Sequence, residues 1–364
     1  MKKPRRDGAY VRVMCRRADK LAERQRHQKR ARLHKNMRRQ GKHRLIARQS
    51  NRQPREHIRL PEQLSLAHNY NGVVEQINRI RDVGNKRLSI NFNHVRHVGA
   101  PAALMLAAEL EVIKIRDNRR YVANDRRWDP NVRYQLDSMG LFGLLKAKHQ
   151  TVKTSGEPLD EDFVRFVSGF GELDGQDIMK IINNVEKAFP AGSITAPFLT
   201  FLYGGMGEAV TNTRDHAYAE NMREDETSRW WISASVNKTN GEIKVICYDR
   251  GLTIPGTIFQ SLKKIEVIGA FVQGELNDQN IVKAAMLKPK SSTRQPFRGR
   301  GLKELVRLIN HNGQGWLEIY SRRGMVRYEK NDIFPDGNYT SSALKRELHG
   351  TLVIWDIIPS TLEE

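Results

Sequence analysis

One candidate binding residue in this sequence is a carboxylate at the end of a strand-like run. Asp249 follows the apolar run Glu242–Tyr248 and precedes the turn-like stretch Arg250–Pro255 (RGLTIP). Such a carboxylate can accept a hydrogen bond from an adenine amino group. Gly251 permits a backbone conformation or a close approach that a side chain would prevent. An ordinary turn has the same composition, so this stretch alone does not establish a site.

Glycines in front of a predicted helix form a second candidate. Arg298-Gly299-Arg300-Gly301 leads into residues 302–309, whose apolar members have helical spacing. Exposed N–H groups and the positive end of the helix dipole favour an anion such as phosphate there, and the two arginines add positive charge. A plain glycine turn before a helix would look the same.

Residues 204–219 form the third candidate. Glu208, Asn212 and Asp215 stand at offsets of zero, four and seven, which places polar groups on one face of a helix. A solvated surface helix has this pattern too. The order of the three segments along the chain therefore carries more information than any one of them.

Strand-like runs surround these candidates and predict the sheet that positions them. Trp230–Val236 and Glu242–Tyr248 flank Asn240-Gly241, a turn pair that can adopt positive φ, and predict an antiparallel hairpin. Trp316–Ser321 and Met325–Glu329 predict a second hairpin around residues 322–324. With a further strand at 350–357, the expected architecture is an α/β fold with an antiparallel or mixed sheet and helices on one face.

A separate α/β alternation precedes this sheet. Tyr70–Val83 has the apolar spacing of an amphipathic helix, and Leu88–Phe92 alternates like a buried strand. Ala100–Ile113 is an apolar run that predicts a helix starting near Pro101. The chain is thus expected to have four parts, which are an arm at 1–58, a small α/β domain at 59–148, a polar linker at 149–162 and a larger domain at 163–364.

Basic residues are concentrated in the arm. Residues 1–60 hold 22 Lys/Arg against 4 Asp/Glu, which is +18 of the net charge of +21, and leave 40 against 37 for the rest. Such a segment has too little apolar surface to fold alone, so a flexible arm is expected, with Ala18–Ile46 able to form a basic helix on a partner. A solubilising tail and a contact with RNA, DNA or a ribosome both fit this composition.

The composition also excludes several classes of protein. The longest apolar stretches, such as Ala100–Leu110, fall short of the roughly 20 residues that cross a bilayer, so no membrane contact is expected. Cys15 and Cys247 are the two cysteines, too few for a disulfide framework or a thiolate metal site. A cytoplasmic location is expected.

Taken in chain order, the candidate segments resemble the GHKL superfamily of histidine kinases, gyrase-type ATPases and anti-sigma-factor serine kinases. Glu208–Tyr218 is similar to its N box (E-x-x-x-N-x-x-x-H-A-Y), Asp249–Pro255 to its first glycine box and Gly299–Leu302 to its second. Gly350-Thr351 matches the family at a later strand. The resemblance implies an α/β sandwich that binds ATP and Mg²⁺.

The resemblance also implies a role for each matching residue. Glu208 would be the catalytic residue that activates a water or hydroxyl, and Asn212 would bind Mg²⁺. The implied nucleotide-binding residues are Asn212, Asp249, Gly251, Gly299, Gly301, Leu302 and Thr351. Thr253 departs from the pattern, because the family has a second glycine there. Lys288, Lys290 and Arg294 fall in the expected lid, 257–297, where they either reach the γ-phosphate or belong to a solvated loop.

Residues 59–148 resemble STAS domains through Arg87–Asn93 as a central strand and through the turn Val98–Pro101 before an apolar helix. STAS phosphoacceptors are serine or threonine at that turn. Because neither occurs here, the domain is expected to bind a partner or to dimerise.

These resemblances leave two functions open. In the first, the chain is a bacterial or phage ATP-binding regulator of the anti-sigma-factor kinase type, which hydrolyses ATP or phosphorylates a regulatory partner protein, itself STAS-like. A homodimer is compatible with this function. In the alternative, it is a non-catalytic, nucleotide-gated regulator that associates with RNA or DNA through the arm. None of the eleven histidines has the setting of a histidine-kinase phosphoacceptor.

Overall fold

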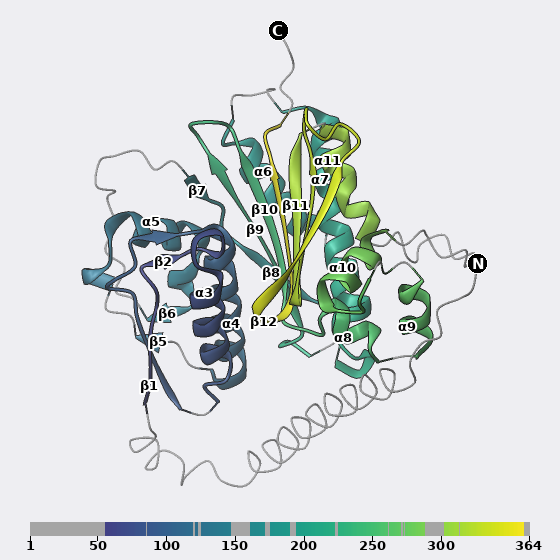
Figure 1. Ribbon diagram of the computed structural model, residues 1–364. Helices are drawn as coiled ribbons and strands as arrows, with labels where there is room; N and C mark the ends of the chain where they lie inside the picture. Colours follow the sequence, from purple (N-terminus) through teal and green to yellow (C-terminus); the bar gives the residue numbers. More distant parts are fainter. Residues whose placement is uncertain are drawn as a thin grey trace, which may run out of the picture.

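A six-stranded sheet lies at the centre of the molecule (Figure 1). The computed structural model describes residues 55–84, 86–118, 121–122, 125–146, 161–171, 175–189, 194–222, 225–260, 262–270, 272, 274–287, 302–312 and 314–359. The arm up to residue 54, including the predicted helix Ala18–Ile46, lies outside these ranges, as do most of the predicted linker and both glycines of the second glycine box. Within them, no helix has the length and apolar character needed to span a membrane.

The sheet has the order β11-β12-β10-β9-β7, with β8 also paired to β9. Its strands are β7 (Glu161–Phe163), β8 (Val167–Phe170), β9 (Arg229–Asn237), β10 (Ile243–Asp249), β11 (Gly315–Lys330) and β12 (Asn338–Ile357). Every pairing among these strands is antiparallel. The predicted hairpin of β9 and β10 is confirmed, and Gly241 in its turn has a φ of 72°.

The second predicted hairpin is wrong. Residues on both sides of 322–324 belong to one continuous strand, β11, which pairs along its length with β12. The expected turn is a β-bulge in which Arg322 has a φ of 59° and the register shifts. Arg322 binds Asp278 at 3.1 Å, and a Cβ on Gly324 would lie 2.7 Å from the Asp278 backbone. Packing against this residue therefore bends the strand where the sequence predicts a turn.

Residues 55–146, here called the N-terminal domain, form a small α/β unit. Its strands pair in parallel as β1 (Arg55–Arg59) with β3 (Arg87–Asn91), β2 (Gln63–Leu64) with β4 (His97–Val98), and β5 (Tyr121–Val122) with β6 (Leu145–Lys146). Its helices are α3 (Leu66–Arg81), α4 (Ala100–Asp117) and α5 (Pro130–Met139), with 3₁₀ turns η2 (Asp125–Arg127) and η3 (Leu141–Gly143). The predicted helices are confirmed, and so is the strand at Leu88–Phe92, although β3 pairs only with β1 among the described residues. Because β1 belongs to this unit, the unit includes residues 55–58, which the sequence assigns to the arm.

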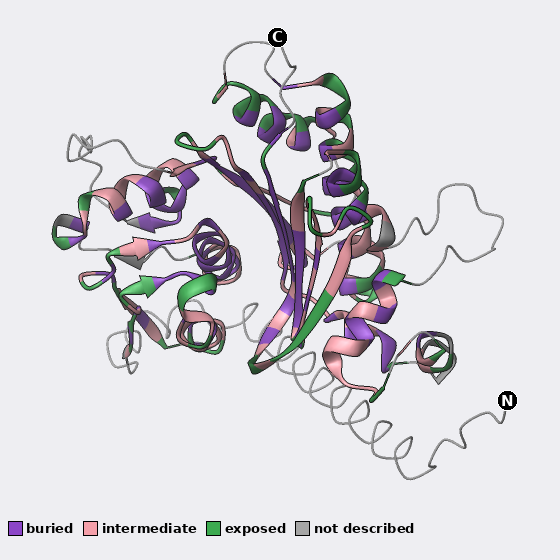
Figure 2. Ribbon diagram, turned by 45° about the horizontal axis from the view of Figure 1, so that its top comes forward, coloured by how far each residue is buried: buried purple, intermediate pink, exposed green. Residues whose placement is uncertain are grey.

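Residues 161–359, here called the C-terminal domain, hold the sheet and the remaining helices. These are α6 (Gly175–Glu186), α7 (Ala196–Asn212), the π-helix η4 (Thr213–Ala217), η5 (Glu220–Met222), α8 (Ile254–Ile258), α9 (Leu262–Gly269), α10 (Asp278–Leu287), η6 (Leu302–Val306) and α11 (Arg307–Asn312). Figures 1 and 2 show α6, α7, α10 and α11 on one face of the sheet.

The N-terminal domain covers the other face, so the sheet lies between its helices and those of the C-terminal domain (Figure 2). Along β10, Val245 and Cys247 pack with α6 and α7, whereas Ile246 and Tyr248 pack in one core with α3 and α4. Side chains alternate between the faces of a strand, so a strand that is apolar at every position needs a cover on both sides. The unbroken run VICY is the sequence signal for this second cover.

Candidate functional site

A cavity of about 420 Å³ lies between the sheet and the helices of the C-terminal domain. Its apolar walls include Ala209, Val210, Ile232, Cys247 and Val353. Its polar lining includes Asn212, Thr213, Asp249 and Thr351. A cavity of this size, with apolar walls and a few convergent polar groups, is typical of sites that bind small molecules.

Asp249 is the buried carboxylate of this cavity. It is the last residue of β10 and is 5 % exposed. Its Oδ1 accepts a hydrogen bond from the Gly251 N–H at 2.8 Å, and the Thr351 N–H donates to the same carboxylate from β12. Burial raises the pKa of Asp249 to about 7, although these hydrogen bonds and the positive charge of Arg81 lower it. A buried, perturbed carboxylate facing a cavity marks a candidate binding residue.

Close backbone approach explains the two glycines near Asp249. A Cβ on Gly251 would overlap the carbonyl oxygen of Ala217, which accepts a hydrogen bond from the Leu252 N–H at 2.6 Å. Gly350 has a φ of 100°, and a Cβ there would overlap the Asp249 carbonyl oxygen. Gly251 therefore joins the strand end to η4, and Gly350 lets β12 approach it closely.

The helix that carries Glu208 and Asn212 begins earlier than the predicted start at residue 204. Thr195 caps α7 by accepting a hydrogen bond from the Phe198 N–H at 3.3 Å, with Pro197 in the first turn. The helix then widens into the π-helix η4 next to the cavity, a feature often found at functional sites. Asn212 lines the cavity, whereas Glu208, one turn earlier and half-buried, lies outside its lining.

Thr253 and Thr351 both make specific hydrogen bonds. Thr253, which stands where the GHKL pattern has glycine, caps α8 by accepting a hydrogen bond from the Gly256 N–H at 3.0 Å. The Ile254 N–H donates to Ser321 Oγ at 2.8 Å, and this oxygen lies 3.2 Å from Thr351 Oγ1. These bonds tie the residues after Asp249 to β11 and β12.

The predicted phosphate end of the site is described in part. Leu302, at the start of η6, lines the cavity. Gly299, Gly301 and the lid residues Lys288, Lys290 and Arg294 lie outside the described residues. Of the predicted site residues, the structure thus brings Asn212, Asp249, Leu302 and Thr351 to one cavity and places Gly251 beside it.

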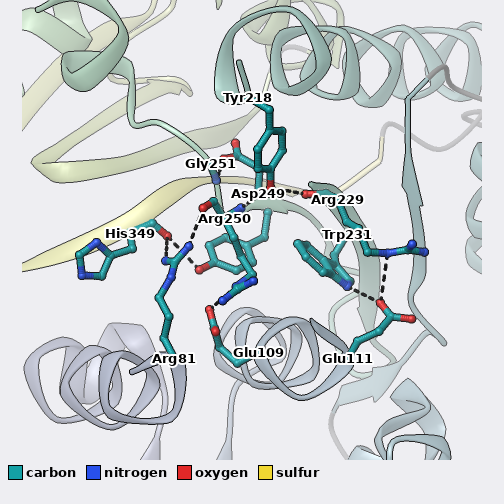
Figure 3. A network of polar contacts seen from close by, with 11 residues as sticks. Arg81, Glu109, Glu111, Tyr218, Arg229, Trp231, Asp249, Arg250, Gly251 and His349 are labelled. Atoms are coloured by element: carbon teal, nitrogen blue, oxygen red, sulfur yellow. Dashed lines mark hydrogen bonds and ion pairs between the residues drawn. The ribbon is translucent and has the colours of Figure 1, made fainter. Parts of the chain in front are cut away.

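Two residues of the site were not assigned roles from the sequence. Thr213 lines the cavity, and its hydroxyl contacts the Asp249 carboxylate and lies 3.1 Å from the Ala209 carbonyl oxygen. The Tyr218 hydroxyl accepts a hydrogen bond from the Arg250 N–H at 3.1 Å and donates to the Arg229 carbonyl oxygen at 2.7 Å (Figure 3). Tyr218 is the last residue of the motif H-A-Y, so the sequence motif could have identified it as a residue of the site.

No protein-family model and no curated protein matches the sequence. A functional assignment therefore depends on the geometry of the cavity and the residues around it.

Proposed function

We propose that the C-terminal domain is of the GHKL type, that its cavity binds ATP with Mg²⁺, and that the chain is an ATP-binding regulatory protein. The observation that carries this proposal is the buried Asp249 carboxylate in the wall of an apolar cavity. Asn212, Leu302 and Thr351 line the same cavity. Four segments that are distant in sequence, each similar to a GHKL motif, thus contribute residues to one cavity, which supports the proposal.

The cavity suits an adenine ring. Ile232, Cys247 and Val353 offer apolar contact to a flat aromatic base, and the Asp249 carboxylate offers an acceptor for its amino group. The N–H groups of Gly251 and Thr351 fix the orientation of that carboxylate before any ligand arrives. An acceptor that is held in place loses little entropy on binding, which favours affinity and specificity.

Asn212 fits the role of a Mg²⁺ ligand. Its amide Oδ1 would be the Mg²⁺ ligand. Its amide Nδ2 is buried without a hydrogen-bond partner among the described residues, so it could donate to an acceptor in the cavity such as a phosphate oxygen. The described residues contain no group of three His, Cys, Asp or Glu side chains that could hold a metal alone. Mg²⁺ commonly binds through one or two protein oxygens together with phosphate and water. When bound, it neutralises charge on the transferring phosphate.

Glu208 is the proposed general base. It lies one turn before Asn212 on α7, so the two side chains share a helix face. A carboxylate beside the γ-phosphate could accept a proton from a water during hydrolysis, or from a serine or threonine hydroxyl of a partner protein during phosphorylation. This role requires the γ-phosphate to lie at the α7 end of the cavity.

Calorimetric titration with Mg²⁺-ATP and a phosphate-release assay test the proposal. Asp249→Asn is expected to weaken Mg²⁺-ATP binding by about 10- to 100-fold, and Glu208→Ala to bind normally without turnover. Asp356→Asn is a matched control, because Asp356 is equally buried at 5 % exposure on β12 but does not line the cavity. Wild-type protein that binds no nucleotide would refute the proposal. A Glu208→Ala protein with wild-type turnover would refute the assigned base.

A further inference from the structure

Arg250 lies inside the first glycine box, but it does not line the cavity, and its side chain points toward Glu109 (Figure 3). It extends toward α4 of the N-terminal domain, where its Nε lies 2.8 Å from Glu109 Oε1. The Glu109 side chain is fully buried and the Arg250 side chain is 12 % exposed. A buried ion pair therefore joins α4 to the residue between Asp249 and Gly251.

The Arg81 guanidinium, from the end of α3, makes a second connection to the same place. It donates to the Arg250 carbonyl oxygen at 2.5 Å and to the His349 carbonyl oxygen at 2.9 Å (Figure 3). These two carbonyls belong to the two segments that supply N–H groups to the Asp249 carboxylate, the loop after β10 and the Gly350-Thr351 part of β12. One side chain of the N-terminal domain thus binds both backbone segments that flank the Asp249 carboxylate.

Other contacts along α3 lack this property. Tyr70 and Asn78 donate to the carbonyl oxygens of Arg346 and Glu347 at 3.1 and 3.0 Å. Glu75 pairs with Arg346 at 2.7 Å with both side chains more than 40 % exposed. These bonds attach α3 to β12 but do not reach the residues around Asp249. A variant of one of them therefore serves as a control, because it changes domain docking without changing a contact to the site.

We propose that Arg81 and Glu109 are positioning residues through which the N-terminal domain controls nucleotide binding by the C-terminal domain. This inference rests on the proposed nucleotide binding. Arg81 and Glu109 fix the Arg250 backbone and side chain, and so hold the Asp249 carboxylate and the Gly251 N–H in the geometry that accepts adenine. Because such coupling is reciprocal, a bound nucleotide strengthens domain docking by the same factor that docking strengthens nucleotide binding.

The N-terminal domain therefore serves as a regulatory domain of the adjoining site. A partner protein that competes for the faces of α3 and α4 would weaken nucleotide binding without touching the cavity. The positive charge of Arg81 adds an electrostatic contribution, because it lowers the pKa of Asp249 and favours the carboxylate form that accepts the amino group.

The test compares Mg²⁺-ATP affinity among Glu109→Gln, Arg81→Gln and the control Glu75→Gln in the full chain, measured below each protein's unfolding transition. The first two variants are expected to bind about 10-fold more weakly, within the usual range of coupling between sites. The control should change affinity by less than about twofold, because exposed ion pairs contribute little. Arg81→Gln should also raise the pH at which Mg²⁺-ATP affinity begins to fall on acidification, because the positive charge of Arg81 lowers the pKa of Asp249. Loss of a merely structural contact would not shift this pH.

Hydrogen exchange on the wild-type protein keeps the inference testable if a variant does not fold. Bound Mg²⁺-ATP is expected to slow exchange in residues 100–117 and 66–81. Wild-type protein that binds nucleotide, with unchanged affinity in both variants or unchanged exchange in α3 and α4, would overturn the inference and leave the proposed function intact. Wild-type protein that binds no nucleotide would overturn both.

Discussion

The two faces of the central sheet bury carboxylates in different ways. On the face toward the N-terminal domain, Glu109 pairs with Arg250, and Glu111 accepts a hydrogen bond from Trp231 Nε1 at 2.6 Å with Arg229 nearby at 3.7 Å (Figure 3). On the opposite face, Asp249 has no ion pair among the described residues and borders an open cavity.

This difference distinguishes the docking surface between the domains from the proposed binding site. Buried charges that hold two packed elements together are paired, since an uncompensated buried charge is strongly destabilising. Burial without an ion-pair partner among the described residues instead raises the pKa of Asp249. Perturbed pKa values of this kind are concentrated at functional sites. The two faces meet at Arg250. Its side chain pairs with Glu109 and its carbonyl oxygen accepts from Arg81, both of the N-terminal domain, while its N–H donates to the Tyr218 hydroxyl.

Alanine substitutions at two neighbouring residues of β12 are expected to have the largest effect on the free energy of unfolding. Ile354 faces the N-terminal domain and Val353 lines the cavity. Ile354→Ala should lower the free energy of unfolding by about 2–5 kcal/mol with little change in nucleotide affinity. Val353→Ala should cost less, about 1–2 kcal/mol, but change nucleotide affinity. Denaturant unfolding and calorimetry measure both. Equal effects on affinity would remove the functional distinction between the faces.

Gly251→Ala tests the close approach of the loop after β10 to η4, beside the cavity. Its Cβ would overlap the Ala217 carbonyl oxygen, so the loop must shift away from η4. The expected loss is about 1–3 kcal/mol in unfolding free energy, together with weaker nucleotide binding. Gly204→Ala is the control, because a Cβ there meets nothing within 4 Å and alanine favours the helix. Normal affinity in Gly251→Ala would contradict the role of this close approach.

The sequence predicts the local elements of this fold better than their partners. Two strand-like runs and the turn pair Asn240-Gly241 predict the β9–β10 hairpin because both signals are local. Arg322–Gly324 has the composition of a turn, but the contact with Asp278, which makes it a bulge, lies outside the local sequence. The pairing of Glu109 with Arg250 joins residues far apart in the chain and leaves no local pattern.

The candidate site shows the same division. Asn212, Asp249 and Thr351 could be selected because each belongs to a motif of its own segment, and the sheet brings them to one cavity. Thr213 has no distinguishing neighbour in sequence, since its contact with Asp249 depends on the π-helical widening after Asn212. The influence of Arg81 on Asp249 arises from domain docking, which follows from packing and not from a motif.

The pH dependence of nucleotide binding gives a smaller effect. With a pKa of about 7, Asp249 becomes protonated as the pH falls from 8 to 6 and loses its ability to accept the adenine amino group. Affinity for Mg²⁺-ATP should therefore fall about tenfold over this range. Tyr218 and Tyr248 also face Asp249, but burial raises their pKa values, so both stay neutral.

Asp249→Asn is the control for this titration, because protonation of the terminal phosphate of the nucleotide affects it and the wild-type protein alike. Residual binding by the variant should lack the additional loss of affinity at low pH. An identical profile in both proteins would mean that Asp249 does not accept the amino group.

Removal of residues 1–54 should have the smallest effect on the cavity. Nucleotide affinity is expected to stay within about twofold, while any salt-sensitive binding of RNA or DNA, measured by filter binding at several salt concentrations, should be lost with the basic residues. The truncation has to stop at 54, because β1 begins at Arg55. Nucleic-acid binding that survives it would place that function in the folded domains.

A comparison of ATP with inosine triphosphate, which has a carbonyl oxygen where adenine has its amino group, tests the proposed adenine site. If the Asp249 carboxylate accepts that amino group, wild-type protein should bind ATP about 10- to 100-fold more tightly, the value of a hydrogen bond to a charged group. Asp249→Asn can donate from its amide and should narrow or reverse the preference. Equal affinities in the wild-type protein, or the same ratio in the variant, would contradict the assignment of the cavity as an adenine site.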